Sequence, residues 1–174
     1  MKVLVTGAAG SIGSKLIHHI QETHPGWEIL GIDNYSTGKK ENKADGMVLL
    51  EMNTWDVNRI ITTRDFNPDI VFHFGEYSKD NDSFDDRDYV MKSNLLGTSE
   101  VVRYCLKNNA KLIYSVNSKF RNNSEDENLN PYSWTKAKMV EMIKNYHSWF
   151  ELQYEIFYSV NREKSLKDWV SNIK

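Results

Sequence analysis

Cysteine is scarce in this sequence of 174 residues, and neither sign of charge is in large excess. The single cysteine, Cys105, lies in the apolar-periodic stretch EVVRYCLK, which excludes an internal disulfide and indicates a buried, inert thiol. The 22 basic and 24 acidic side chains give a formal net charge of -2, without the basic excess typical of nucleic-acid binding. No apolar run approaches the roughly 18 residues of a membrane span. We therefore expect small molecules or proteins as partners, with no nucleic acid and no membrane.

A leader, a linker and a metal-ligand pattern are also missing. The apolar strand pattern begins at once, with no basic and then apolar leader before it, so we expect a cytoplasmic protein. No linker rich in proline, glycine or serine and no internal repeat divides the chain, so residues 1–174 are expected to form a single domain. No two of the five histidines have the spacing of metal ligands, so no metal is expected.

Short apolar runs alternate with helical patterns along the chain. Six runs have the length of strands, at residues 2–6, 27–33, 47–50, 69–74, 111–115 and 154–160. Helical patterns lie between them, at residues 12–22, 56–66, 89–108 and 132–150. Strands that alternate with helices of this length imply right-handed crossovers and a parallel sheet covered on both faces. The sequence therefore predicts an α/β fold with a doubly wound parallel sheet, the three-layer α/β/α Rossmann fold.

The opening stretch MKVLVTGAAGSIGSKL carries three spaced glycines, Gly7, Gly10 and Gly13, directly after the first strand. In a strand-turn-helix unit the first glycine allows the tight turn, the second lets a pyrophosphate approach bare backbone, and the third permits close packing. The N–H groups that begin the helix then face the anion. The alternative is a structural turn that binds no ligand.

Asp33 ends the second strand, about 20 residues beyond the glycines. At this place a carboxylate would hydrogen-bond an adenosine ribose diol and repel a 2′-phosphate. Asp33 therefore favours NAD over NADP, and the alternative is an aspartate that caps its own loop.

Four stretches in this order, TGAAGSIG, DNYSTG, NLLGT and YSWTK, resemble the extended short-chain dehydrogenase/reductase family. Within that family the resemblance is to NAD-dependent nucleotide-sugar epimerases and dehydratases of the UDP-galactose 4-epimerase type, and it covers residues 1–160. It implies NAD as the cofactor and a UDP-, dTDP-, GDP- or ADP-linked sugar as the substrate. The cofactor-binding positions that it implies are Gly7, Gly10, Ser11, Ile12, Gly13, Asp33, Asn34, Asn53, Gly75, Asn94, Tyr132 and Lys136.

The resemblance assigns the chemistry to YSWTK. Tyr132 and Lys136 lie four residues apart on one helical face, so the ammonium can sit near the phenol and lower its pKa. Such a phenolate can take a proton from a sugar hydroxyl while the nicotinamide takes the hydride. In the family the lysine also binds the nicotinamide ribose.

Two loops depart from the family's pattern. A serine or threonine after the fifth strand normally donates a hydrogen bond to the reacting hydroxyl, and here ungapped counting gives Asn117 whereas a one-residue gap gives Ser118. The fourth strand normally ends in Ala-Ala or Ala-Gly beside the cofactor, and here Gly75 is followed by the bulky, charged Glu76. Glu76 is interpreted as a substrate contact, a general acid, an obstruction near the cofactor or an ordinary loop carboxylate.

Members of the family carry a further C-terminal lobe that binds the nucleotide sugar, and this sequence lacks it. In the last stretch, SLKDWVSNIK, Leu166, Trp169, Val170 and Ile173 share one helical stripe, so we expect a closing helix on a minimal cofactor domain rather than a fragment. Two other hypotheses are a module that keeps NAD without turnover and a subunit that pairs with full-length relatives. The resemblance further implies a homodimer through the two long helices that hold NLLGTSEVVRYCLK and YSWTKAKMVEMIKNYHSWF.

Overall fold

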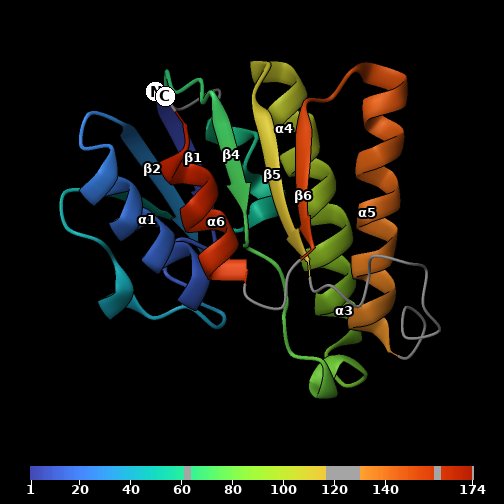
Figure 1. Cartoon of the computed structure of the whole chain (residues 1–174). Helices are drawn as coiled ribbons and strands as arrows, with labels where there is room; N and C mark the ends of the chain where they lie inside the picture. The colour runs from blue at the N-terminus through green and yellow to red at the C-terminus, as the bar shows by residue number, and fades with distance from the viewer. Residues whose placement is uncertain (61–63, 117–129, 159–161, 174) are drawn as a thin grey trace.

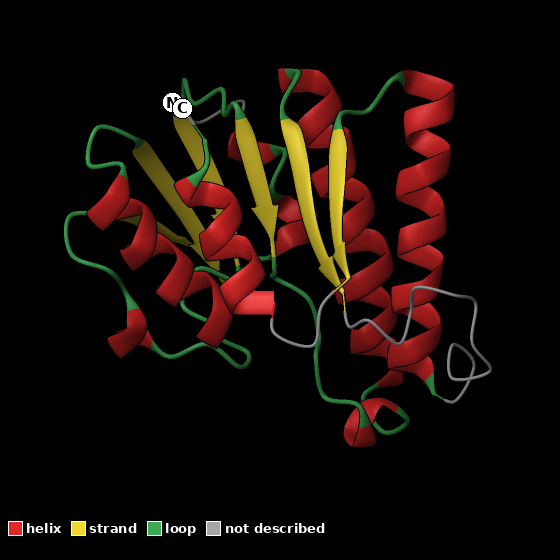
Figure 2. Ribbon diagram, viewed as in Figure 1, coloured by secondary structure: helices red, strands yellow, loops and turns green. Residues whose placement is uncertain are grey.

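A sheet of six parallel strands forms the centre of the fold (Figures 1 and 2). The structure is a computed structural model, and it describes residues 1–60, 64–116, 130–158 and 162–173. The strand order is β3-β2-β1-β4-β5-β6, which runs outward in both directions from β1 and confirms the predicted doubly wound α/β sheet. The strands are β1 (Lys2–Thr6), β2 (Glu28–Asp33), β3 (Val48–Glu51), β4 (Ile70–His73), β5 (Lys111–Val116) and β6 (Tyr154–Tyr158).

Helices cover both faces of the sheet (Figure 1). The helices α1 (Ser11–Thr23) and α6 (Arg162–Ser171) pack together on one face, and α4 (Gly97–Asn108) and α5 (Pro131–Phe150) cover the other. The side chains of β1 alternate between the two cores: Leu4 packs on the side of α4 and α5, and Val3 and Val5 on the side of α1 and α6. Full burial of such an apolar side chain contributes roughly 1.5–3 kcal/mol to folding.

Cys105 is fully buried within α4, as its apolar-periodic surroundings predict. Burial raises the pKa of its thiol, so the reactive thiolate is disfavoured and the sulfur behaves as a small apolar group.

The helix predicted over 89–108 is interrupted by a π-helical segment. A short helix, α3 (Arg87–Val90), leads into the π segment η4 (Met91–Leu96), and α4 then begins at Gly97. A β-carbon at Gly97 would collide with the side chain of Thr54 in the 3₁₀ turn η2 (Thr54–Asp56), so glycine allows this close approach. Such π segments are frequent at functional sites.

The predicted closing helix is present as α6. Leu166 and Val170 are buried against the core that α1 also covers, and Trp169 packs edge-on against Phe72 and Phe157 at ring distances of 5.9 and 6.0 Å. The helix predicted over 56–66 is described only in part, because residues 61–63 lie outside the described ranges. Two more 3₁₀ turns are η1 (Lys40–Asn42) and η3 (Asn81–Ser83). None of the helices in the described ranges has both the length and the apolarity needed to cross a membrane.

Candidate functional site

The three predicted glycines form the turn between β1 and α1, and each meets different surroundings. Gly7 has a left-handed backbone, with φ of 68°, and a β-carbon there would meet the backbone nitrogen of Gly75 at 2.8 Å. A β-carbon at Gly13 would collide with the carbonyl oxygen of Gly7. At Gly10 only that same carbonyl oxygen comes near, at 3.1 Å. Gly7 and Gly13 are therefore required for packing, whereas Gly10 keeps the turn open toward the pocket that it lines.

The first turn of α1 offers N–H groups to an anion. Gly10 is the N-cap residue and makes no side-chain cap hydrogen bond, and no acidic side chain lies in the first turn. The N-terminus of a helix carries unpaired donors and the positive end of the helix dipole, both of which favour a phosphate. Ser11 and Ile12 follow Gly10 along the wall of the pocket.

Asp33 ties the glycine turn to the end of β2. One carboxylate oxygen accepts a hydrogen bond from the Ala9 backbone N–H at 2.9 Å, and the other accepts one from the Tyr35 backbone N–H at 2.7 Å. The loop-capping role is therefore present, and the same carboxylate also lines the pocket. Each carboxylate oxygen can accept a further hydrogen bond, which leaves acceptor capacity for the two hydroxyls of a ribose.

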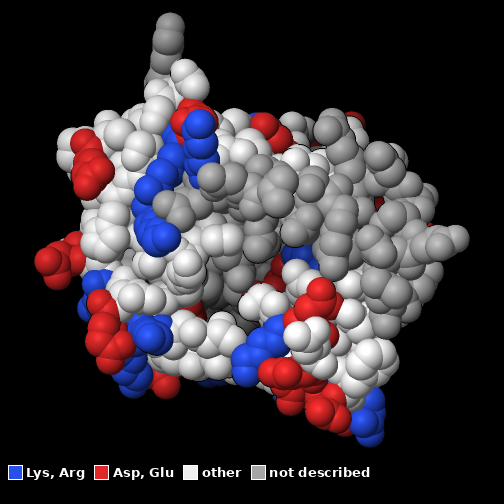
Figure 3. Space-filling model, turned by 60° about the horizontal axis from the view of Figure 1, so that its bottom comes forward, with Lys and Arg blue, Asp and Glu red and all other residues white. Residues whose placement is uncertain are grey.

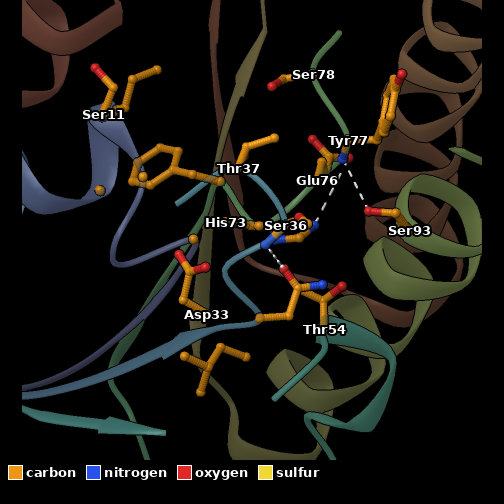
Figure 4. Close-up of a pocket in the computed structure, with 18 of the residues that line it drawn as sticks. Ser11, Asp33, Ser36, Thr37, Thr54, His73, Glu76, Tyr77, Ser78 and Ser93 are labelled. Carbon is orange, nitrogen blue, oxygen red and sulfur yellow. Dashed lines mark hydrogen bonds and ion pairs between the residues drawn. The ribbon is translucent and has the colours of Figure 1, made fainter. Parts of the chain in front are cut away.

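A single pocket collects most of the predicted site residues at the carboxyl ends of the strands. Figure 3 looks onto this end of the molecule, where the surface is hollowed and charged side chains of both signs lie around the hollow. In Figure 4, Ser11 and Asp33 lie on one side of the pocket and Glu76, Tyr77 and Ser93 on the other. The predicted residues that line the pocket are Gly7, Gly10, Ser11, Ile12, Gly13, Asp33, Asn34, Gly75, Tyr132 and Lys136.

Two predicted residues in the described part of the chain, Asn53 and Asn94, are not among those that line the pocket. The side-chain oxygen of Asn53 accepts a hydrogen bond from the Asn34 amide at 2.9 Å, so it supports a lining residue from behind. Asn94 is fully buried, accepts a hydrogen bond from the Tyr77 backbone N–H at 2.8 Å and donates one to the Tyr77 carbonyl at 3.3 Å. Its role in the described structure is to hold the loop after β4. Asn117 and Ser118 lie outside the described residues.

The start of α5 brings Tyr132 and Lys136 to the pocket. Asn130 is the N-cap residue, and its side-chain oxygen accepts a hydrogen bond from the Ser133 backbone N–H at 2.8 Å. Pro131 occupies the first helical position, where its missing N–H has no partner to lose. With the helix start fixed in this way, the i and i+4 side chains Tyr132 and Lys136 both line the pocket.

Lys136 is held in a buried ion pair with Glu76. The ammonium donates to one carboxylate oxygen of Glu76 and, at 2.8 Å, to the hydroxyl of Tyr114. The Tyr114 hydroxyl in turn donates to the other Glu76 oxygen at 2.8 Å. Only 3% of the Lys136 side chain and 7% of the Glu76 side chain are exposed. Glu76 is therefore not an ordinary loop carboxylate, because it forms an ion pair with the lysine of the predicted Tyr-Lys pair.

A chain of hydrogen bonds runs from the glycine turn to Glu76. Thr6 accepts hydrogen bonds from the backbone N–H groups of Phe74 and Gly75, so its own proton goes to His73 Nδ1 at 2.6 Å. Because a carboxylate only accepts hydrogen bonds, the Thr98 hydroxyl donates its proton to Glu76, at 2.8 Å. The same hydroxyl oxygen therefore accepts a hydrogen bond from His73 Nε2, also at 2.8 Å. This pairing gives a neutral imidazole with its proton on Nε2.

Burial and charge set the ionisation of this network. Burial lowers the pKa of His73 to about 4, against the opposing attraction of Glu76, so the ring is neutral near pH 7. For Glu76, burial acts to raise the pKa, but the charge of Lys136 and the hydrogen bonds from Lys136 and Thr98 bring it below its ordinary value. The buried pair of Glu76 and Lys136 is therefore a carboxylate facing an ammonium.

Ser115, at the end of β5, adds a polar group that the sequence analysis did not identify. It lines the pocket, it is 3% exposed, and its hydroxyl has no hydrogen-bond partner within the described part of the chain. A buried hydroxyl without a partner is costly, so this one fits a site that a polar ligand completes. Its position at the carboxyl end of β5, where a doubly wound sheet binds its ligand, is the signal that could have found it.

Tyr77, Tyr114, Thr98 and His73 were also missed as parts of the site. Tyr77 lines the pocket and its hydroxyl donates to Asp86 at 2.8 Å; burial, together with Asp86, raises the pKa of the phenol. The other three surround Glu76: Thr98 and Tyr114 lie 22 and 38 residues from it along the chain, whereas His73 lies only three residues before it, at the end of β4. Among the described residues, no group of three histidine, cysteine, aspartate or glutamate side chains could hold a metal ion.

Comparison with protein families gives one match across most of the chain. Residues 3–162 match the model of a family described as the NAD dependent epimerase/dehydratase family. A curated relative, UDP-glucose 4-epimerase of Mycolicibacterium smegmatis, is 30% identical over 103 residues, which cover 56% of this chain and 32% of the relative. ADP-L-glycero-D-manno-heptose-6-epimerase of Alkalilimnicola ehrlichii is 27% identical over 158 residues, covering 83% of this chain and 48% of the relative. The chain thus spans between a third and a half of these relatives' length.

Solved structures share the fold at similar coverage. UDP-glucose 4-epimerase of Thermus thermophilus, solved in complex with NAD, is 25% identical with a TM-score of 0.78, covering 91% of this chain and 54% of that one. UDP-glucose 4-epimerase of Brucella ovis, also in complex with NAD, is 25% identical with a TM-score of 0.76, covering 89% of this chain and 50% of that one.

Proposed function

Because this chain belongs to the NAD dependent epimerase/dehydratase family, we propose that residues 1–174 form one NAD-binding domain that acts on a nucleotide sugar. The observation that carries the proposal is the meeting of the glycine turn, Asp33, Tyr132 and Lys136 around one pocket. These groups come from β1, β2 and α5, and a purely structural turn gives no reason for the tyrosine and lysine to line the same pocket.

The residues present fit the ADP half of NAD. The open backbone at Gly10 and the first N–H groups of α1 suit the pyrophosphate, and the spare acceptor capacity of Asp33 suits the adenosine ribose. Ser115 offers an unsatisfied hydroxyl elsewhere in the same pocket. When bound, NAD supplies a hydride acceptor that the protein side chains lack.

The chain's own residues have distinct roles in this proposal. Tyr132 accepts the proton of a sugar hydroxyl, and Lys136 supplies a positive charge beside it and orients the nicotinamide ribose. Ser118 or Asn117 donates a hydrogen bond to the same sugar oxygen. The sugar is UDP-, dTDP-, GDP- or ADP-linked, and the protein works in the cytoplasm.

The chemical role of Tyr132 is tested by Tyr132→Phe, which removes one oxygen and keeps the ring. The protein is incubated with NAD and each of the four classes of nucleotide sugar, and nicotinamide absorbance and sugar products are followed. We expect turnover by the wild-type protein and a loss of about 100-fold or more in the variant, with folding and NAD affinity unchanged. Equal turnover by the two proteins would contradict the assignment of Tyr132 as the base.

A second candidate function, an NAD-binding module without turnover, is favoured by the pair of Glu76 and Lys136. Lys136 can lower the pKa of the Tyr132 phenol only through its positive charge, and here the buried Glu76 carboxylate balances that charge. Tight NAD binding with no change in any sugar would favour this candidate, and co-purification with a full-length relative would favour a partner subunit.

We further propose a homodimer through α4 and α5. At the end of α5, Trp149 and Phe150 are 64% and 57% exposed and stack edge-on, and Tyr146 packs against both rings. Large apolar side chains gathered on one part of a surface are typical of an interaction site.

A further inference from the structure

Glu76 stands where a cofactor-binding lysine would meet its ligand. The ammonium of Lys136 already donates to the Glu76 carboxylate and to the Tyr114 hydroxyl, both within the described structure. Glu76 and Lys136 line the same pocket as the glycine turn and Asp33. Two of the three N–H donors of Lys136 are therefore directed at partners within the protein, and a carboxylate already balances the charge of the ammonium.

The surroundings of Glu76 favour the closed pair. Three donors, from Lys136, Tyr114 and Thr98, point to its two carboxylate oxygens, and the chain of hydrogen bonds through His73 leads to the same place. If the carboxylate moved away, Tyr114 and Thr98 would lose their acceptor and Lys136 would keep only the uncharged Tyr114 hydroxyl. The pair is also electrically neutral, so its separation would leave two uncompensated charges in a buried place.

A ribose hydroxyl is a weak competitor for this ammonium. The Glu76 carboxylate attracts the ammonium with a full opposite charge, whereas a ribose hydroxyl offers only a dipole, and the carboxylate is held in place by its other donors. The ADP half of the pocket, at Gly10 and Asp33, has no contact with Glu76 among the described hydrogen bonds and is open to its ligand. The half of the pocket at Gly10 and Asp33 is therefore open to a ligand, whereas in the half at Lys136 the ammonium is already paired with Glu76.

We propose that Glu76 is a positioning residue that competes with the nicotinamide ribose for Lys136, so that this chain recognises the ADP half of its nucleotide and gains little from the rest. The inference rests on the proposed NAD-binding function. The ligand class it names is the ADP-containing nucleotides, with NAD, ADP-ribose and ADP bound at similar strength.

The test is the ratio of NAD affinity to ADP affinity, measured by isothermal titration. In the wild-type protein we expect the ratio to be no more than about threefold, since no strong hydrogen bond to the nicotinamide ribose is gained. Glu76→Gln keeps the shape and removes the charge, and it is expected to raise the ratio by about tenfold, the worth of one charge-assisted hydrogen bond. A merely structural effect of the substitution would weaken both ligands together and leave the ratio unchanged.

Two variants serve as controls. The double variant Glu76→Gln/Lys136→Met lacks the ammonium, so the gain in the ratio should disappear. Glu155→Gln removes a carboxylate that pairs with Lys111 at 2.8 Å, away from the pocket residues, and should leave the ratio at its wild-type value. Circular dichroism shows whether each variant is folded.

A ratio that stays the same or falls in Glu76→Gln would overturn the inference and leave the proposed NAD function standing. If wild-type protein binds neither ADP nor NAD, the inference and the proposed function both fail. If Glu76→Gln does not fold, the wild-type ratio decides, and NAD binding more than about tenfold tighter than ADP would overturn the inference.

Discussion

Gly10 and Gly13 lie three residues apart in one turn, yet a side chain would have opposite consequences at the two positions. At Gly10 the backbone is extended and a β-carbon would meet only the Gly7 carbonyl oxygen, at 3.1 Å, so Gly10→Val should still fold while its side chain blocks the approach of the pyrophosphate. At Gly13 the new side chain would meet the Gly7 carbonyl, so Gly13→Val should lose about 1–3 kcal/mol of stability through overpacking.

Thermal unfolding and NAD titration of both variants check this prediction. Gly10→Val is expected to lose less stability than Gly13→Val, because its β-carbon would lie farther from the Gly7 carbonyl oxygen, at 3.1 Å, than one at Gly13, and to show no NAD binding. NAD binding by Gly10→Val at wild-type strength would contradict the placement of the pyrophosphate at this turn.

His73 makes the stability of the protein depend on pH. Its pKa is lowered to about 4 in the folded state, against an ordinary value of 6.5, because the ring is buried. The unfolded chain therefore binds more protons between these pH values, and stability falls as the pH drops from 6.5 toward 4. From pH 7 to pH 5 we expect a loss of about 2 kcal/mol from this residue alone.

Urea unfolding at pH 7 and pH 5 measures this loss. His73→Gln keeps one donor and one acceptor but does not titrate, so its stability should change far less over this range. His18→Gln, which alters an exposed histidine on α1, should behave as the wild-type protein does. An equal pH response from His73→Gln and the wild-type protein would contradict the assignment.

Among the elements, the π segment η4 fixes the loop that carries Glu76. Ser93 and Asn94 are neighbours in this segment, and both accept a hydrogen bond from the Tyr77 backbone N–H, at 3.0 and 2.8 Å (Figure 4 shows the contact with Ser93). Asn94 also donates to the Tyr77 carbonyl at 3.3 Å and to the Thr135 hydroxyl at 3.0 Å. Asn94→Ala should therefore cost about 1–3 kcal/mol, because a buried carbonyl loses its partner, whereas Ser93→Ala should cost less than about 1 kcal/mol.

Urea unfolding of the two variants gives the comparison directly. Equal losses for Ser93→Ala and Asn94→Ala would mean that the loop after β4 does not depend on the second contact of Asn94. A larger loss in Ser93→Ala would contradict the prediction outright.

The sheet could be predicted from the sequence because its signals are local. Each strand is a short apolar run, and strands that alternate with helices favour parallel neighbours, so the alternation predicts a parallel sheet with both faces covered. The order of the strands comes from the structure. The glycine turn and the pair Tyr132 and Lys136 are local too, and both line the pocket. The π segment could not be predicted, because its helical residues have the same apolar spacing as an ordinary helix.

The contacts of Glu76 could not be predicted, because they join residues far apart in the chain. Lys136 lies 60 residues from Glu76 and Tyr114 lies 38 residues away. The sequence marked Glu76 only as a charge where a small residue was expected. Its partners Lys136 and Tyr114 are identified only in the folded structure, where α5 and β5 lie beside the loop after β4.

For the whole molecule, association is the first property to measure. We expect light scattering at tens of micromolar to give about twice the chain mass of 20.3 kDa, because apolar rings are exposed at the end of α5. Trp149→Glu should shift the population toward the monomer. A wild-type mass of one chain at these concentrations would contradict the dimer.

The central claim is that the pocket binds NAD and discriminates against NADP, and isothermal titration of the wild-type protein with each nucleotide tests it most directly. The account predicts binding of NAD and much weaker binding of NADP, because the Asp33 carboxylate faces the place of the 2′-phosphate. Asp33→Ala should weaken NAD binding by about 1–3 kcal/mol, the scale of hydrogen bonds to a charged group left unmade. Equal affinity for the two nucleotides, or no binding of either, would contradict the account.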